Sequence, residues 1–496
     1  MAMNEPYSTG TVKTQKELRF AIIGAGMAGI LSAIKLTEAG MTNFTVYEKA
    51  DRLGGTWREN TYPGLSCDVP SHLYTYSFAP NPEWSHVYSP GEEIETYLEN
   101  VSRRYDVTKF IRFCDEVLSC ELRDGRWCLT TRSGHHDDVD VVIAATGVLH
   151  HPNYPDIEGL ESFGGAMFHS ARWDHGVSLD HKRVGIIGTG STAVQIVTAI
   201  VGQVEELKLF QRTAQWIMPV VNQAYTPDEQ ESFRRDLQLL ADQYANLSQL
   251  FDLFSGAVVD AESPGMQMIE DACRKNLEEN VTDPDLRERL RPDYRAACKR
   301  LIISPNFYQA IQQPNAELVT DQIVGVEAGG VRIADGRLHE LDVLVLATGF
   351  KADAFVRPMA VTGRAGRNID EAWAGGPQAY LAISVPDFPN FFMLNGPNGP
   401  VGNFSLMQVA ELQLAYILQL VDRIRSGDCR EICATRAALE EFELARVEAA
   451  RRTIWATGCR SWYLDERGIP SAWPWPFQRF REEMDKPKWE AYDIRR

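Results

Sequence analysis

Residues 19–40, RFAIIGAGMAGILSAIKLTEAG, combine a short apolar strand, a glycine-rich turn and a helix with apolar residues at three- and four-residue spacing. Gly24, Gly26 and Gly29 have the GxGxxG spacing, which turns a strand tightly into a helix whose N-terminus can bind a pyrophosphate. The next apolar run, FTVYEKA, carries Glu48, an acid suited to a ribose hydroxyl. A lone GxGxxG also occurs in ordinary tight turns, but strand, helix and acid together predict a dinucleotide site.

A second unit of the same kind lies at 183–201, RVGIIGTGSTAVQIVTAIV. Its glycines, Gly188 and Gly190, are followed by Ala193 as an accepted third small residue. The strand after it ends at Arg212, where the first unit has an acid, and a guanidinium there suits a 2′-phosphate. We therefore expect NADP(H) at the second unit. Its candidate contacts are Gly188, Thr189, Gly190, Ser191, Thr192, Arg212 and Thr213.

Two further apolar runs, 139–147 and 341–350, end in Ala-Thr-Gly and have the composition of buried parallel strands. Residues 222–300 are charged and lack a strand pattern, which indicates a helical insertion. The predicted fold class is α/β, with two Rossmann-like dinucleotide-binding domains and this insertion in the second. Two dinucleotide sites, one of them suited to NADP(H), imply a flavoprotein that NADPH reduces.

The domain order follows from these units. We expect the first part of an FAD-binding domain, a linker, an NADP-binding domain with the insertion, and a return to the FAD domain with a C-terminal tail, at 1–150, 151–180, 181–345 and 346–496.

The composition disfavours several other classes of protein. A net charge of −18 argues against nonspecific binding to nucleic acids or anionic membranes, because both need a basic surface. No apolar run approaches the roughly 18 residues of a membrane span. The start, MAMNEPYSTGTVKTQKEL, lacks the apolar core of an export signal, so we expect a short disordered lead and a cytoplasmic protein. Nine cysteines without a CxxC pair favour reduced, mostly buried thiols over a disulfide framework or a zinc site.

Two longer patterns connect the chain to a known family. One is F-x-G-x-x-x-H-x-x-x-W-[PD], whose fixed places in FGGAMFHSARWD are filled by Phe163, Gly165, His169, Trp173 and Asp174. The other is [AG]-G-x-W-x4-[FY]-P-[GM]-x3-D, which GGTWRENTYPGLSCD meets with Gly54, Gly55, Trp57, Tyr62, Pro63, Gly64 and Asp68. With both glycine loops, the chain resembles type I Baeyer–Villiger monooxygenases, which are class B flavin-dependent monooxygenases, from Leu18 to about residue 403.

The resemblance implies oxidation of a ketone to an ester or lactone. In such enzymes NADPH reduces FAD, O2 adds at flavin C4a, and the resulting peroxyanion attacks the ketone. An anion of this kind needs a fixed cation in a closed site. By the resemblance, Arg300 is that cation, because a guanidinium keeps its charge at any working pH, and Asp68 holds it. Lys299 then joins Arg212 at the NADP 2′-phosphate.

Other roles follow from the same resemblance. Thr56 and Trp57 are expected at the FAD phosphates and ring, and Tyr74 near the flavin. His169 is expected to position the linker and NADP rather than to transfer protons, so that the fingerprint acts as a hinge that couples nicotinamide binding to closure. The substrate pocket is expected to include the loop Phe404, Ser405, Leu406, the helical insertion, and the tail around Trp473 and Trp475.

Two other functions share parts of this pattern. A flavin-dependent N- or S-oxygenase, which uses a protonated hydroperoxyflavin, has both glycine loops but needs no Arg300–Asp68 pair. A pyridine nucleotide-disulfide reductase has a redox cysteine pair near its first domain's active face, where this chain has Cys67 alone. The pattern therefore favours ketone oxygenation. It leaves open the ketone, the oligomeric state (monomer or dimer) and the role of segment 458–468, GCRSWYLDERG.

Overall fold

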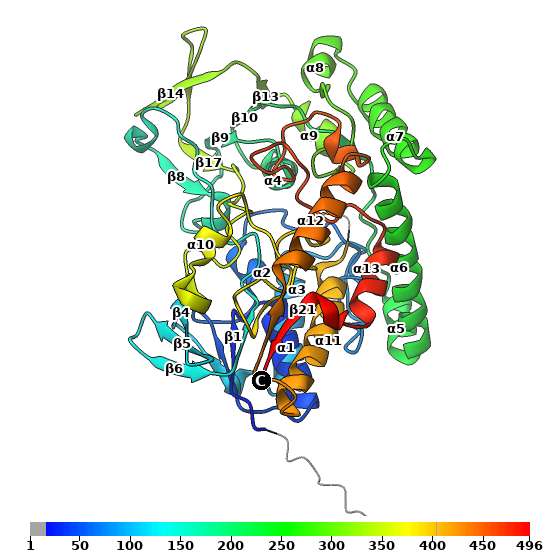
Figure 1. Cartoon of the computed structure of the whole chain (residues 1–496). Coiled ribbons are helices and arrows are strands. Elements are labelled where there is room, and N and C mark those ends of the chain that lie inside the picture. Colours follow the sequence, from blue (N-terminus) through cyan, green and yellow to red (C-terminus); the bar gives the residue numbers. More distant parts are fainter. Residues whose placement is uncertain (1–15, 403) are drawn as a thin grey trace, which may run out of the picture.

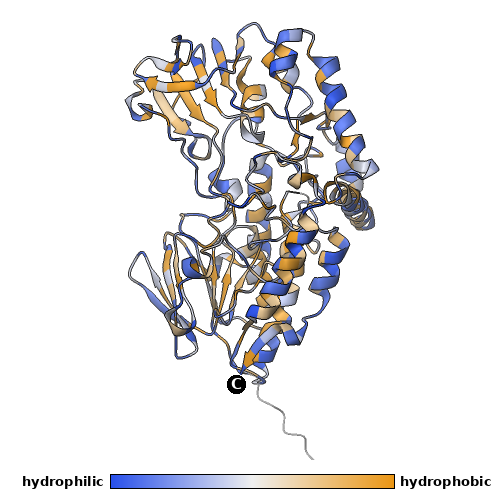
Figure 2. Cartoon of the chain, turned by 45° about the horizontal axis from the view of Figure 1, so that its top comes forward, coloured by the Kyte–Doolittle hydropathy of each residue, from blue (hydrophilic) through white to orange (hydrophobic). Residues whose placement is uncertain are grey.

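The computed structural model describes residues 16–402 and 404–496. The predicted disordered lead falls almost entirely outside this part of the chain. Two groups of apolar strands lie at opposite ends of the molecule, and long helices run along one side of both (Figures 1 and 2). Among the described residues, no helix has both the length and the apolar character to span a membrane.

The first sheet is a five-stranded parallel sheet with the order β19-β7-β1-β2-β3. Its strands β1 and β7 are buried along their whole length, as expected for a parallel sheet covered on both faces. The edge strand β19 comes from the last third of the sequence, so the chain returns to this sheet after the second one. The strands are β1 Phe20–Ile23, β2 Phe44–Tyr47, β3 Ile111–Arg112, β7 Val141–Ala144 and β19 Phe391–Met393.

The second sheet is also five-stranded and parallel, with the order β13-β10-β9-β17-β8. Its strands are β8 Ala166–His169, β9 Arg183–Ile187, β10 Glu206–Phe210, β13 Ala316–Val319 and β17 Val343–Leu346. Each sheet thus contains one strand, β1 or β9, that leads through a glycine loop into a helix, α1 Met27–Glu38 or α4 Ser191–Ile200. The predicted α/β fold class with two Rossmann-like units is confirmed. The exact domain boundaries stay a prediction.

The fingerprint contributes β8, a strand at the edge of the second sheet, where the sequence indicated a connecting linker. Gly165 is required just before it, because a Cβ there would lie 2.4 Å from the backbone oxygen of Asp342. Trp173 packs edge-on against Phe168 of β8, with ring centroids 4.9 Å apart. The regular spacing of the fingerprint therefore reflects close packing of this edge strand as well as its place between the sheets.

The predicted insertion is helical. Its helices begin at side-chain caps: Thr226 forms a capping box, and Asp236, Ser263 and Asp283 accept hydrogen bonds from the first backbone N–H groups. In Figure 1 they form the green column along one side of the molecule. The helices are α5 Pro227–Arg235, α6 Leu237–Val258, α7 Pro264–Asn280 and α8 Pro284–Arg289.

The remaining elements complete the two halves. The other helices are α2 Thr56–Glu59, α3 Gly91–Arg104, α9 Phe307–Ile311, α10 Ile369–Ala372, α11 Leu406–Arg425, α12 Arg436–Ala450 and α13 Phe477–Asp485. The other strands are β4 Val117–Arg123, β5 Arg126–Thr131, β6 His136–Val139, β11 Ile217–Met218, β12 Ile302–Ile303, β14 Ile323–Glu327, β15 Gly330–Ile333, β16 Leu338–Glu340, β18 Ala360–Thr362, β20 Glu431–Ala434 and β21 Tyr492–Arg495. Helix α11 packs on α1, so the C-terminal part belongs to the first core.

One expectation about the cysteines is wrong. Cys298 and Cys459 form a disulfide across 161 residues, with their Cα atoms 6.1 Å apart. The end of the insertion and the C-terminal tail share a small core that holds both cysteines, and a sequence pattern cannot reveal a pairing created by tertiary packing. The other seven cysteines are free thiols, and all are buried except Cys114, which is exposed, and Cys128, which is half-buried.

Candidate active site

A cavity of 1450 Å³ has both glycine loops in its wall. Sixteen of the predicted site residues line it, although they come from segments far apart in the sequence. They are Gly24, Gly26, Glu48, Thr56, Trp57, Asp68, Tyr74, Gly188, Thr189, Gly190, Ser191, Thr192, Arg212, Thr213, Lys299 and Arg300. The structure therefore brings the two predicted dinucleotide units and the predicted cation together around one space.

The first glycine loop depends on its glycines for backbone conformation and for packing. Gly24 has a φ of +103°, and a Cβ at Gly29 would lie 1.8 Å from the oxygen of Gly24. Gly29 is thus a packing glycine that brings α1 against β1, and it is not part of the cavity wall. Helix α1 starts at Gly26 without a side-chain cap and without an acid in its first turn, which leaves its first N–H groups suited to an anion.

Glu48 is held at the end of β2 by three donors. The backbone N–H groups of Ala25 and Ala50 donate to its carboxylate over 2.8 and 3.0 Å, and Arg58 donates over 3.0 Å. Only 4% of Glu48 is exposed. Burial disfavours the charge on Arg58, but Glu48 and Glu59 outweigh this effect and raise the arginine pKa. Sequence reasoning did not assign a role to Arg58, although it stands next to Trp57 in the second family pattern.

The second glycine loop repeats this design. Gly188 has a φ of +119°, and a Cβ there would lie 2.2 Å from the oxygen of Ala347. Helix α4 also begins without a side-chain cap, at Gly190, and no atom lies within 4 Å of a Cβ built there. The hydroxyl of Thr189 donates to the oxygen of Thr213 over 2.7 Å, which ties the loop to the end of β10.

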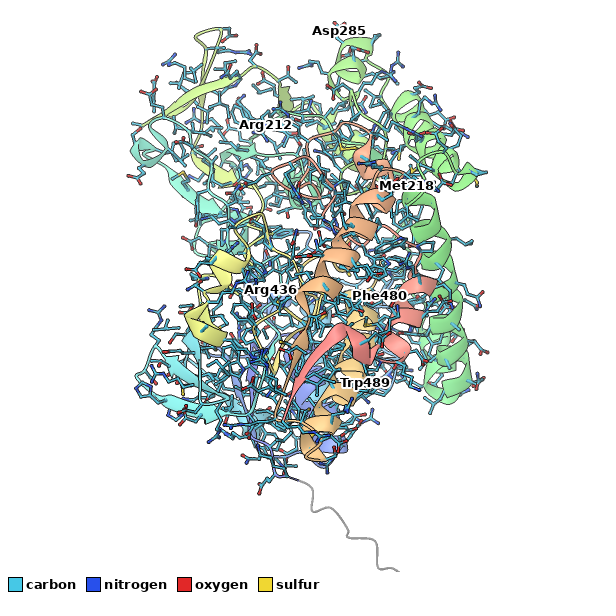
Figure 3. The ribbon with its side chains drawn as sticks, in the orientation of Figure 1. Arg212, Met218, Asp285, Arg436, Phe480 and Trp489 are labelled. Atoms are coloured by element: carbon cyan, nitrogen blue, oxygen red, sulfur yellow. A yellow bond between two sulfur atoms is a disulfide. The ribbon has the colours of Figure 1, made fainter. Side chains whose placement is uncertain are left out.

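Two cations face the cavity beside this loop. Arg212 is exposed at the end of β10, and Figure 3 labels it in the half of the molecule that holds the second sheet. Burial and the nearby charge of Arg212 lower the pKa of Lys299. The Lys299 ammonium also lies over the Tyr294 ring, 4.6 Å from its centroid. An anion bound between the two cations would relieve their repulsion, because it would interact favourably with both.

Arg300 and Asp68 form an ion pair, as the resemblance implied. Asp68 Oδ2 accepts from Arg300 Nε over 2.7 Å and lies 2.5 Å from Nη2. The Arg300 side chain is 31% exposed, and it lines the cavity. Burial opposes its charge, but Asp68 and the nearby Tyr463 raise its pKa above the ordinary value. The pair therefore provides a permanently charged guanidinium in a fixed orientation on the cavity wall.

Aromatic side chains form another part of the wall. Trp57 Nε1 donates to the hydroxyl of Tyr74 over 3.2 Å, and the two rings meet edge to face. The Tyr74 hydroxyl lies 3.6 Å from the sulfur of Met27 in α1. Burial raises the Tyr74 pKa, so its phenol stays neutral. These contacts join the first glycine loop to the Trp57 loop through two aromatic rings and a thioether.

His169 lies beside the cavity and is not one of the residues that line it. Its Nδ1 accepts from the Ala171 N–H over 3.1 Å, and its Nε2 lies 3.1 Å from the Gly349 oxygen. Burial lowers the His169 pKa, and 1% of the residue is exposed. This geometry fits a residue that positions the chain, and direct contact of His169 with a cofactor stays a prediction.

The expected substrate wall is only partly correct. Phe404 and Leu406 line the cavity, whereas residues 222–296 of the insertion do not. Trp473 and Trp475 are also absent from the wall, because they pack with Phe442 and other aromatic rings in the first core. The wall also includes residues that were not predicted there. Among them are Asn395 and three members of segment 458–468, Arg460, Ser461 and Trp462.

Comparison with known proteins identifies the family. The flavin-binding monooxygenase-like family model matches residues 17–251. A Baeyer-Villiger monooxygenase of Streptomyces coelicolor is 37% identical over 489 residues, which cover 98% of this chain and 94% of that protein. The chain belongs to the Baeyer–Villiger monooxygenase family. An uncharacterized monooxygenase of Mycobacterium tuberculosis is 47% identical to this Baeyer–Villiger family member over 478 residues, 96% of each chain.

Solved structures extend the similarity to the fold. A closed crystal structure of cyclohexanone monooxygenase is 30% identical, with a TM-score of 0.86 over 97% of this chain and 100% of that one. A complex of OTEMO with FAD and NADP is 25% identical, with the same TM-score and the same coverage. This Baeyer–Villiger monooxygenase therefore has the fold of those enzymes over nearly its whole length.

Proposed function

We propose that this enzyme uses NADPH and O2 to oxidise ketones to esters or lactones. The Arg300–Asp68 pair carries the proposal, because it puts a fixed cation on the wall that both glycine loops share. A developing oxyanion is stabilised most by such a preoriented charge in a site that excludes water. In this proposal, Arg300 and Asp68 are the catalytic pair.

The first glycine loop fits FAD. Gly24 and Gly26 line the cavity without side chains, and the uncapped start of α1 favours negative charge. Glu48 is oriented to accept from a ribose, while Thr56, Trp57 and Tyr74 offer a hydroxyl and two rings nearby. The bound flavin would supply the redox and oxygen-transfer chemistry, including the peroxyflavin that the sequence resemblance implied.

The second glycine loop fits NADP(H). Gly188, Gly190 and the start of α4 form a second uncapped helix N-terminus, and Arg212 and Lys299 stand beside it as two neighbouring cations. The 2′-phosphate of NADPH is negatively charged and would pair with these two cations. Because NADH has no such phosphate, the site would select NADPH over NADH.

The fingerprint is proposed to couple the two units. Arg172, three residues after His169, pairs with Glu59 over 2.5 Å, and Glu59 also contacts Arg58, which holds Glu48. A change in the position of β8 would therefore move these adjacent ion pairs and, through them, Glu48 beside the first glycine loop. This arrangement supports the hinge expected for residues 163–174.

The disulfide does not make this protein a disulfide reductase. Cys298 is fully buried and Cys459 is 5% exposed, and neither lines the cavity. Cys67, the cysteine that does line it, is a buried free thiol whose pKa is raised by burial. A thiol of this kind is a poor nucleophile, because the thiolate is the reactive form.

The test is product formation from cyclic, linear and aryl ketones with NADPH, in comparison with amines and sulfides. We expect an ester or lactone from at least one ketone, with product lost in Arg300→Ala and retained in Arg291→Ala. Arg291 is the control because it does not line the cavity and pairs with Glu288. Oxidation of amines or sulfides alone would instead make the enzyme an N- or S-oxygenase. Full ester formation by Arg300→Ala would overturn the role of Arg300.

A further inference from the structure

Segment 458–468 is anchored beside the catalytic pair. Its Cys459 is bonded to Cys298, and Cys298 lies two residues before Arg300. Both cysteines belong to a small core that also contains Trp455 and Tyr463. The disulfide therefore joins the C-terminal tail directly to the short stretch that carries Arg300.

Tyr463 of this segment lies close to Arg300. The guanidinium is near enough to act on the pKa of the Tyr463 phenol, and 2% of the residue is exposed. The rings of Trp455 and Trp462 flank it, with centroids 5.5 and 4.2 Å away. Gly402 makes room for the hydroxyl, because a Cβ at Gly402 would lie 1.9 Å from it. The phenol is thus confined on several sides, close to the guanidinium.

The backbone around Tyr463 is fixed as well. Its carbonyl oxygen accepts from the N–H and the hydroxyl of Ser471, over 2.7 and 3.0 Å. The oxygen of Ser471 in turn accepts from the amide of Asn398 over 3.1 Å. Asp465 closes the turn between them by accepting from two backbone N–H groups, those of Arg467 and Ile469. The segment is therefore held at Cys459, at Tyr463 and at Ser471.

We propose that Tyr463 is a positioning residue for Arg300 and that the Cys298–Cys459 disulfide holds the segment that carries it. Nε and Nη2 of Arg300 both contact the same carboxylate oxygen of Asp68, about which the guanidinium could still pivot. A second acceptor would stop this rotation, and we assign that part to the hydroxyl of the neighbouring Tyr463. A neutral phenol does so without cancelling the positive charge, and burial raises the Tyr463 pKa to about 12, which keeps it neutral. The inference rests on the proposed function, because it assigns a helper to the catalytic Arg300.

The first test replaces only the hydroxyl, with Tyr463→Phe. A hydrogen bond to a charged group corresponds to about a tenfold effect, so we expect the ratio of hydrogen peroxide to ester to rise by about tenfold. FAD content and the rate of anaerobic flavin reduction by NADPH should stay unchanged, which a general structural defect would not allow. The matched control is Tyr416→Phe, which removes another buried hydroxyl, one bonded to Tyr492 in the first core. An unchanged ratio in Tyr463→Phe would overturn the role of Tyr463.

The second test concerns the disulfide and needs no turnover. Thiol titration of the denatured, unreduced holoenzyme should find seven thiols out of nine cysteines. Hydrogen exchange in the peptide containing residues 458–471 should become faster in Cys298→Ala and in Cys459→Ala. Each single variant should equal the double variant, because either change removes the same bond. Nine thiols in the untreated protein, or effects that add, would overturn the tether.

Double variants separate this inference from the proposed function. If Tyr463 acts through Arg300, Tyr463→Phe should change neither the rate of NADPH oxidation nor the peroxide yield when added to Arg300→Ala. An effect of the same size in both backgrounds would overturn the inference alone. Ester formation that survives in Arg300→Ala would instead overturn the proposed role of Arg300, whatever Tyr463→Phe does.

Discussion

The charged side chains beside the two glycine loops differ in sign. Glu48 is held by two backbone N–H groups and Arg58, whereas Arg212 and Lys299 present positive charge beside the second glycine loop. The contrast matters because the two loops are otherwise nearly alike in backbone shape. The charge at the end of the following strand is what distinguishes the nucleotides that the loops are proposed to bind.

Replacing Arg212 by alanine is expected to weaken the use of NADPH selectively. A charge-assisted hydrogen bond to a phosphate contributes about 1.5–3 kcal/mol, so the KM for NADPH should rise by about tenfold to a hundredfold. The KM for NADH should change little, since that cofactor has no 2′-phosphate. Steady-state kinetics with both cofactors measure this. An equal rise for both would show that Arg212 does not contact the 2′-phosphate.

These side chains also mark what the sequence could predict. Gly24, Gly26 and Glu48 lie within one short unit, so their spacing alone indicated their neighbourhood. Asp68 and Arg300 lie 232 residues apart, and only the family resemblance connected them. Tyr463 and the disulfide had no such signal, because their contacts depend on how the tail packs against the end of the insertion.

Among the elements, the two helices α1 and α4 have the same task, because each brings an uncapped N-terminus to the cavity. Their apolar faces and glycine spacing made both predictable. Strand β8 was not predictable as a strand, since its four residues are too short to show a period, and its pairing with β17 comes from much later in the sequence. Short edge strands of this kind are defined by their partner more than by their own residues.

Gly29→Ala tests the contact between α1 and β1. The added methyl would lie 1.8 Å from a backbone oxygen, which cannot move without shifting the whole glycine loop. We expect a destabilisation of about 2 kcal/mol or more and a purified protein with little FAD. Gly202→Ala is the control, because a Cβ at Gly202 meets no atom within 4 Å. Flavin absorbance and thermal unfolding of both variants give the answer, and normal FAD content in Gly29→Ala would contradict the packing role.

Across the entire chain, the two sheets, the insertion and the C-terminal helices are joined by contacts between distant segments. His72, in the loop before α3, packs edge-on against Tyr225 and Phe233 at the start of the insertion. Its Nε2 is buried without a hydrogen-bond partner. The insertion is thereby attached to the first half of the molecule through an uncharged imidazole.

Acid is therefore expected to loosen this attachment. Burial lowers the His72 pKa to about 4, from an ordinary value of about 6.5, so the unfolded chain binds a proton that the folded chain refuses. The contribution of neutral His72 to the free energy of unfolding is complete above about pH 6.5. It falls by up to about 3 kcal/mol as the pH drops toward 4. His72→Phe should reduce the loss of unfolding temperature between about pH 7.5 and pH 5. The same loss in both proteins would exclude His72 as a cause.

Oxygen labelling during turnover tests most directly whether this enzyme inserts an oxygen atom into ketones with the help of Arg300. The enzyme, NADPH and a responsive ketone are mixed under ¹⁸O₂, and the mass of the product is measured for the wild type and for Arg300→Ala. The wild type is expected to form an ester or lactone that carries one ¹⁸O atom, and Arg300→Ala is expected to form none. Unlabelled product, or NADPH oxidation that yields only hydrogen peroxide with every ketone while an amine or sulfide gains the label, would contradict this expectation.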